Sequence, residues 1–151
     1  MYSLDQEGED KRPHPLPIGE IAFLDLVAAM PHHTHMNGKR ITVVETSVFT
    51  RRVEKLLDTE EREALVDYLA ANPEAGDVMQ DLGGIRKVRF AAKGRGKSGG
   101  VRVIYFYQTE ATPLYALMIY AKNEKADLSG DDRKAMRAVV EAIKASWEGR
   151  R

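Results

Sequence analysis

The sequence predicts a single α+β domain in which an antiparallel sheet of about four strands packs against helices. Short β-prone apolar runs and longer amphipathic runs follow one another in the order β-α-α-β-β-β-α. The 151 residues, 43% hydrophobic and 30% charged, have the composition of one globular domain with a sizeable core. We expect a helical hairpin to cover one sheet face, while the other face stays partly open.

The first half of this domain predicts one strand followed by the helical hairpin. Residues 41–45 form a short apolar strand, and Ser47 is expected to cap the first helix. A second helix begins at Asp58 or Thr59, where acidic residues suit the positive end of the helix dipole. Asn72-Pro73 ends it, because the residue before proline disfavours the helical conformation.

The second half predicts three adjoining strands and a last helix. Gly83-Gly84 opens a strand at 85–92, and two further strands follow over 101–108 and 113–122. Apolar residues at helical spacing then predict a C-terminal helix from Ser129 or Asp131. Consecutive strands usually pair, so we expect a meander with the first strand of the domain at an edge.

The first 36 residues differ in composition from the rest and are predicted to be an extension, flexible or mis-annotated. They hold four of the six prolines, all four histidines and more acidic than basic residues, and Met36 is a possible alternative start. Residues 37–151 form the predicted domain and carry a net charge of +4. The His-rich stretch at 32–35 has no second ligand cluster, so we expect no metal site.

Several classes of protein are excluded or disfavoured by composition. The chain has no cysteine, which excludes disulfides and thiolate chemistry. No apolar run has the length of a membrane span, and the acidic start lacks the features of a signal peptide. We therefore expect a cytoplasmic protein without a membrane partner.

Positive charge is concentrated in one hairpin. Between Gly83 and Thr109 the chain has no Asp or Glu and seven Lys or Arg residues: Arg86, Lys87, Arg89, Lys93, Arg95, Lys97 and Arg102. Such a concentration attracts a polyanion and steers its encounter. The alternative is a solvated face whose lysines keep a sheet edge soluble. The glycine-rich loop does not match a phosphate-binding P-loop, because a strand follows it.

The alternation of side chains along a strand predicts which face of the sheet each of these cations occupies. If Val88 and Phe90 face the helices, Lys87 and Arg89 point to the opposite face, and Arg102 joins them if the register allows. The domain has no histidine after position 35, so cleavage of RNA would depend on Lys and Arg. A lysine with a lowered pKa can take a proton from a ribose 2′-OH, and guanidinium groups can stabilise the phosphate.

The segments LGGIRKVRFAAKGRGKSGGVRVIYFY and LMIYAKNEKADLS, in this element order, resemble the RelE/HigB toxins of bacterial type II toxin–antitoxin systems, over about residues 41–147. The resemblance implies a RelE-like fold. It also implies a metal-free endoribonuclease without a cofactor, which cuts mRNA in the ribosomal A site by attack of the 2′-OH. Expected partners are the ribosome, mRNA and a cognate helix-turn-helix antitoxin, through which the toxin reaches operator DNA indirectly.

The same resemblance implies site residues. Lys87, Arg89, Arg102 and Lys122 match basic catalytic positions, with Lys87 as base and Arg102 as phosphate stabiliser. Ser129 stands where RelE has a tyrosine that stacks on the cut nucleotide. The residues expected to contact RNA or the ribosome are Arg86, Lys93, Arg95, Lys97, Asn123 and Lys125.

Two other functions remain open at this point. A ParE-like toxin of the same superfamily would inhibit DNA gyrase, although such relatives generally lack the basic set. A module of the same fold that binds RNA or the ribosome without cleavage is the second alternative, and the missing tyrosine favours it.

Overall fold

The computed structural model describes residues 31–36, 39–91, 100–124 and 127–148. Within these ranges the chain forms six strands and three helices, in agreement with the predicted α+β class. In chain order they are β1 (Pro31–Met36), β2 (Lys39–Glu45), α3 (Ser47–Leu56), α4 (Thr59–Ala71), β3 (Asp77–Val78), β4 (Ile85–Phe90), β5 (Val101–Phe106), β6 (Leu114–Ala121) and α5 (Gly130–Glu148). From β2 onward the order matches the predicted β-α-α-β-β-β-α, apart from the two-residue β3.

The sheet is larger than predicted, and it is mixed rather than antiparallel. Its strand order is β1-β2-β6-β5-β4-β3, and β2 runs parallel to β6. The prediction that the first strand of the domain lies at an edge is wrong, because β1 pairs antiparallel with β2 along its outer side. Residues 31–36, which the sequence assigned to the extension, therefore belong to the sheet.

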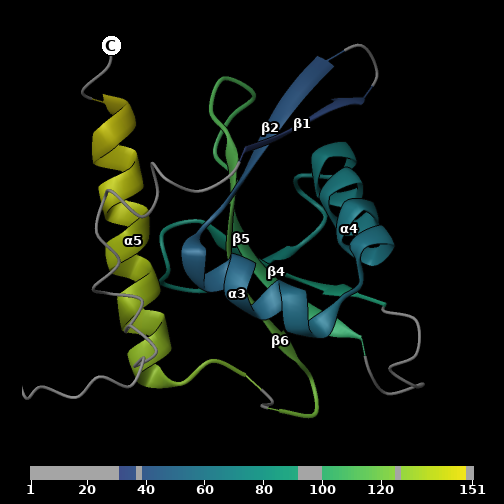
Figure 1. Cartoon of the computed structure of the whole chain (residues 1–151). Helices are drawn as coiled ribbons and strands as arrows, with labels where there is room; N and C mark the ends of the chain where they lie inside the picture. Colours follow the sequence, from purple (N-terminus) through teal and green to yellow (C-terminus); the bar gives the residue numbers. More distant parts are fainter. Residues whose placement is uncertain (1–30, 37–38, 92–99, 125–126, 149–151) are drawn as a thin grey trace, which may run out of the picture.

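Helices cover both faces of the sheet (Figure 1). On one face α3 and α4 enclose a core with Phe49, Val53, Leu65 and Leu69 at its centre. On the other face α5 packs Met136 and its neighbours against β4, β5 and β6. The second face is open only in part, as expected, because α5 covers the rest of it with its own apolar stripe.

Short polar side chains fix the starts of the helices. Thr46, one residue before the predicted cap, accepts a hydrogen bond from the amide of Phe49 at its Oγ1 and donates to the carbonyl of Leu117. Asp58 and Glu61 form a capping box at α4. Ser129 and Asp132 exchange hydrogen bonds in the same way at α5. The hydrogen bond from Thr46 to Leu117 also ties the start of α3 to β6.

The hairpin of β4 and β5 requires a glycine at position 100, immediately before β5 begins. Gly100 has φ +67°, and a Cβ there would lie 2.8 Å from the carbonyl oxygen of Phe90. Only glycine accepts both conditions without strain. Beside this glycine, β4 and β5 pair in the register that places Arg89 opposite Arg102. The loop that contains Lys93, Arg95 and Lys97 lies outside the described residues.

Candidate nucleic-acid interface

Three cations of the hairpin lie on the face of the sheet that α5 covers in part. Lys87 and Arg89 alternate with Val88, which packs into the α3–α4 core, so both cations point to the other face. Arg89 is directly opposite Arg102, and Arg102 is directly opposite Tyr120 on β6. The structure therefore brings Lys87, Arg89 and Arg102 together, and we call these three residues the basic row.

Two arginines opposite each other on neighbouring strands repel one another. In addition, Nη1 of Arg102 is buried and has no hydrogen-bond partner within the described part of the chain. A buried donor without an acceptor destabilises the fold by about 1–3 kcal/mol. An anion between the two guanidinium groups would relieve both penalties, which is the property expected of a phosphate site.

Lys87 contacts a carboxylate that follows β6 in the chain. Its Nζ lies 3.3 Å from Oδ1 of Asp127, and the same oxygen accepts a hydrogen bond from the amide of Leu128 at 2.7 Å. The pKa of Asp127 is lowered, first by the Leu128 amide and then by Lys87, with a smaller contribution from Arg133. Asp127 is therefore ionised at neutral pH and partly neutralises the basic row.

Tyr120 lies beside Arg102 on the neighbouring strand β6. Its ring is fully buried, and burial raises the pKa of its hydroxyl, while the charges of Asp127 and Arg102 act on it in opposite directions. A buried ring offers no face on which a base could stack. Tyr105 and Tyr115 are buried as well, so these strand tyrosines serve the core.

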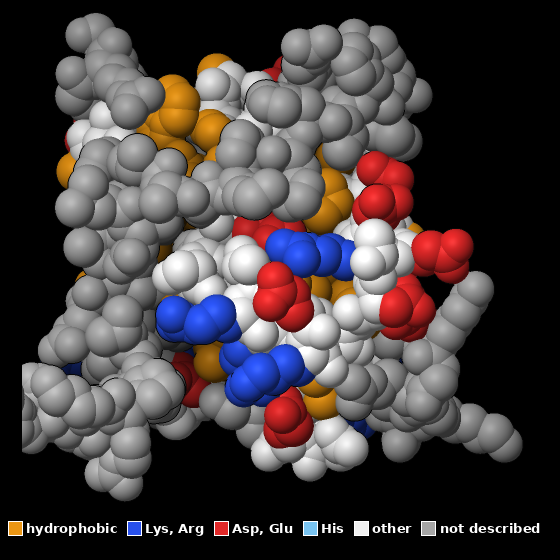
Figure 2. All heavy atoms as spheres, in the orientation of Figure 1, with side chains coloured by type: hydrophobic (Ala, Val, Ile, Leu, Met, Phe, Trp, Pro, Cys, Tyr) orange, Lys and Arg blue, Asp and Glu red, His pale blue; other side chains and the backbone are white. Residues whose placement is uncertain are grey.

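Arg86 does not join the basic row. It lies on the α3–α4 side, where its Nη1 donates to the carbonyl oxygens of Glu74 and Gly76 and ties β4 to the segment after α4. On that face, Lys and Arg side chains alternate with Asp and Glu, and acidic side chains gather over α4 (Figure 2). A polyanion would find no continuous basic surface there.

Of the predicted residues that remain, the structure describes Lys122 and Asn123. Lys122 and Asn123 are exposed in the turn after β6. Since Val101 pairs with Ala121, this turn lies at the same end of the sheet as Arg102. Lys125, like Lys93, Arg95 and Lys97, lies outside the described residues.

Sequence reasoning missed Asp127, Tyr120 and Arg133 as neighbours of the basic row. Asp127 had a visible signal, because it is an acidic residue that follows Lys122 and Lys125 close to the strand exit. Arg133 had none, since its place depends on how α5 begins beside Asp127.

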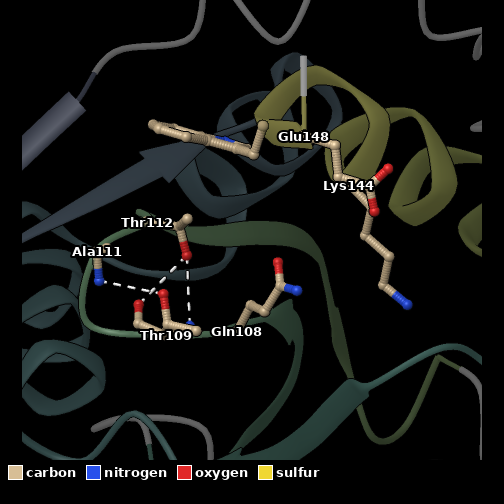
Figure 3. A pocket seen from close by; sticks show the side chains of 7 residues that line it. Gln108, Thr109, Ala111, Thr112, Lys144 and Glu148 are labelled. Atoms are coloured by element: carbon tan, nitrogen blue, oxygen red, sulfur yellow. Dashed lines mark hydrogen bonds between the residues drawn. The ribbon is translucent and has the colours of Figure 1, made fainter. Parts of the chain in front are cut away.

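A separate hollow of about 280 Å³ lies at the opposite end of the sheet, between the β5–β6 turn and the end of α5. Thr109 and Thr112 line it and hydrogen-bond each other, while Lys144 and Glu148 extend from α5 (Figure 3). This hollow shares no residue with the basic row. Among the side chains that the structure describes, no three His, Asp or Glu residues are grouped to hold a metal ion.

The sheet has a helical hairpin on one face, a C-terminal helix on the other and a row of cations on the β4–β5 hairpin. Residues 41–148 match the family described as the RelE toxin of the RelE/RelB toxin–antitoxin system. Because the match covers most of the chain, this protein belongs to the RelE toxin family. Such a toxin is paired with a cognate RelB-like antitoxin. None of the helices in the described ranges is both long and apolar enough to cross a membrane.

Proposed function

We propose that this toxin is a ribosome-dependent endoribonuclease that cuts mRNA in the ribosomal A site without a metal ion. The observation that carries the proposal is the basic row, in which Arg89 and Arg102 face each other and a guanidinium nitrogen of Arg102 is buried without an acceptor among the described residues. The scissile phosphate would supply the missing acceptor. Guanidinium groups suit this task because they are always charged and present several donors in one plane.

The reaction is an internal transfer at phosphorus. The ribose 2′-oxygen attacks the phosphorus, the bond to the 5′-oxygen breaks, and a 2′,3′-cyclic phosphate remains. One group must take the proton of the 2′-OH, and another must give a proton to the departing 5′-oxygen. Arg89 and Arg102 stabilise the charge that builds on the phosphate oxygens, and Lys122 at the strand exit adds to that stabilisation.

The contact between Lys87 and Asp127 bears on which group is the base. An ammonium that donates to a carboxylate has no free lone pair, so Lys87 takes a proton only after this contact is lost and a proton has left. Asp127 is already ionised at neutral pH. If Lys87 is the base, Asp127→Asn should keep much of the cleavage rate, because it removes only the contact that engages Lys87. If Asp127 is the base, the rate should collapse in Asp127→Asn.

The proposed partners follow from the family and the charge. The ribosome and its mRNA supply the polyanion for the basic row. The antitoxin is proposed to carry a helix-turn-helix part, so that operator DNA is reached through the complex. A small helix-turn-helix protein encoded in the adjacent gene and co-purifying with the toxin would support this pairing, and a neighbour without such a part would contradict it.

The direct test is primer extension on a translated mRNA after addition of the purified toxin. Cuts within codons, lost in Lys87→Ala and Arg102→Ala, support the nuclease. DNA breaks that depend on gyrase would instead indicate the ParE-like activity. Binding to ribosomes without any cuts would indicate a binding module that has no nuclease activity.

A further inference from the structure

The turn that follows β6 is held from outside the sheet by an arginine of α3. Nε of Arg52 donates to the carbonyl oxygen of Ile119 at 3.0 Å, and Nη2 lies 2.5 Å from Oε1 of Glu124. The guanidinium thus bridges the last residues of the strand and the end of the turn. We call Arg52 and Glu124 the turn clamp.

Glu124 also closes the turn on itself. The oxygen that receives Arg52 accepts a second hydrogen bond from the amide of Ala121 at 3.0 Å, and the amide of Glu124 donates to the carbonyl of Ala121. One carboxylate oxygen therefore joins α3, the strand end and the turn. Lys122 and Asn123, between these fixed points, have exposed side chains.

We propose that Arg52 is a positioning residue for the nuclease site. Through Glu124 it fixes the turn that carries Lys122 and leads to Asp127, the partner of Lys87. This inference rests on the proposed function. Arg52 does not touch the RNA in this account, since its guanidinium is engaged with Ile119 and Glu124.

The chain length allows the clamp to act on Asp127. Asp127 is only three positions after Glu124, which is a reach of roughly 10 Å in extended chain. A shift of the turn by an ångström or two therefore moves the carboxylate that contacts Lys87. Misplacement of about 1 Å in a catalytic group can lower a rate by about a hundredfold.

A purely structural role would look different. The side chains of Arg52 and Glu124 are 38% and 44% exposed, and an ion pair of that exposure contributes about 0–1 kcal/mol to stability. Loss of the clamp should therefore leave the fold nearly as stable as before. Its effect should appear in the local order of the turn and in the chemical step.

The experiment compares Arg52→Gln and Glu124→Gln with Arg51→Gln in the full chain. Arg51 is the neighbouring, exposed arginine of α3, so its replacement makes the same change in charge as Arg52→Gln. We expect faster hydrogen exchange at the amides of Ala121 and Glu124 in both clamp variants. We also expect single-turnover cleavage at saturating toxin to fall about 10- to 100-fold. Arg51→Gln should match the wild type in both measurements, and Arg52→Lys, which cannot keep both contacts, should lie in between.

Clamp variants that cleave as fast as Arg51→Gln would overturn the inference, whatever the exchange rates show. Unchanged exchange at Ala121 and Glu124 would also overturn it, because the turn would then be held by other contacts. These results are distinguishable from failure of the proposed function, in which the wild type itself leaves ribosome-bound mRNA intact.

Discussion

At the residue scale, Arg102 lies at an energetically unfavourable position in the sheet. It faces Arg89 across the strands and has a buried nitrogen that no described acceptor satisfies. A residue kept for stability alone would not occupy such a place, because an apolar side chain there would remove both penalties. Its role is therefore expected to be in binding an anion.

Replacement of Arg102 should separate function from stability. We expect Arg102→Ala to abolish growth arrest and mRNA cleavage while its melting temperature stays equal to or above that of the wild type, because repulsion with Arg89 is lost. Calorimetry and a toxicity assay at equal protein abundance check this. Arg137→Ala is a matched control, since Arg137 contacts the carbonyl of Asp81, away from the basic row. A toxic Arg102→Ala variant at equal abundance would contradict the account.

The contact between Lys87 and Asp127 has a defined pH dependence. The pKa of Asp127 is lower in the folded chain than the ordinary value of about 3.9, so its contacts contribute stability above that value and lose it as the pH falls through the folded-state pKa. A carboxyl-carbon NMR titration should show a midpoint below about 3.9. Lys87→Met should raise the midpoint only in part, since the Leu128 amide remains. A wild-type midpoint at or above the ordinary value would refute this.

At the element scale, a buried ion pair joins β2 to the helical hairpin. The side chain of Glu45 is fully buried and accepts from Nη2 of Arg62 at 2.5 Å, from Nε of Arg62 at 3.2 Å and from the hydroxyl of Thr50 at 2.9 Å. Since Glu45 ends β2 and Arg62 lies in α4, the pair fixes where the hairpin meets the sheet. The ion pair therefore determines how the α3–α4 hairpin sits on its face of the sheet, and it contacts no residue of the basic row.

Breaking this pair should destabilise the fold. Arg62→Met leaves the carboxylate of Glu45 buried without its main partner, and we expect the free energy of unfolding to fall by about 3 kcal/mol. Glu54→Gln removes only an exposed partner 4.0 Å from Arg62 and should change it by less than about 1 kcal/mol. Denaturant unfolding measures both. Equal effects of the two substitutions would show that burial of Glu45 is not what matters.

The sequence predicts the elements well where local signals agree. Caps, helix dipoles and apolar spacing located α3, α4 and α5 to within a residue or two, and alternation assigned Lys87 and Arg89 to one face. The side of Arg102 could not be read in the same way, because it depends on the register in which β5 pairs with β4. The same alternation does place Arg86 on the face of Val88, away from Lys87, and only its contacts with the carbonyls of Glu74 and Gly76 depend on the fold.

At the scale of the whole molecule, the sheet extends beyond the matched family region. The match begins at residue 41, whereas β1 pairs with β2 from Pro31 to Met36. This strand could not be expected from its residues, because the six begin with proline, include three histidines and show no regular alternation of apolar and polar side chains. The parallel pairing of β2 with β6 could not be predicted from the sequence either, because it joins residues about 70 positions apart.

Two truncations test the place of β1. Removal of residues 1–30 should leave the melting temperature and toxicity intact. Removal of residues 1–36 should lower the melting temperature and solubility, because the outer edge of β2 then lacks its partner. Thermal melting and ultracentrifugation of both proteins check the difference. If both melt alike and stay monomeric, β1 adds nothing to the fold.

The central claim is that a row of guanidinium and ammonium groups cuts message on the ribosome. The most direct measurement adds purified toxin to stalled, programmed ribosomes in the presence of a chelator that spares the ribosomal magnesium, and analyses the ends of the mRNA. The account predicts 2′,3′-cyclic phosphate ends at A-site codons with the wild type and intact mRNA with Arg102→Ala. Intact mRNA with the wild-type toxin, or equal cutting by Arg102→Ala, would contradict it.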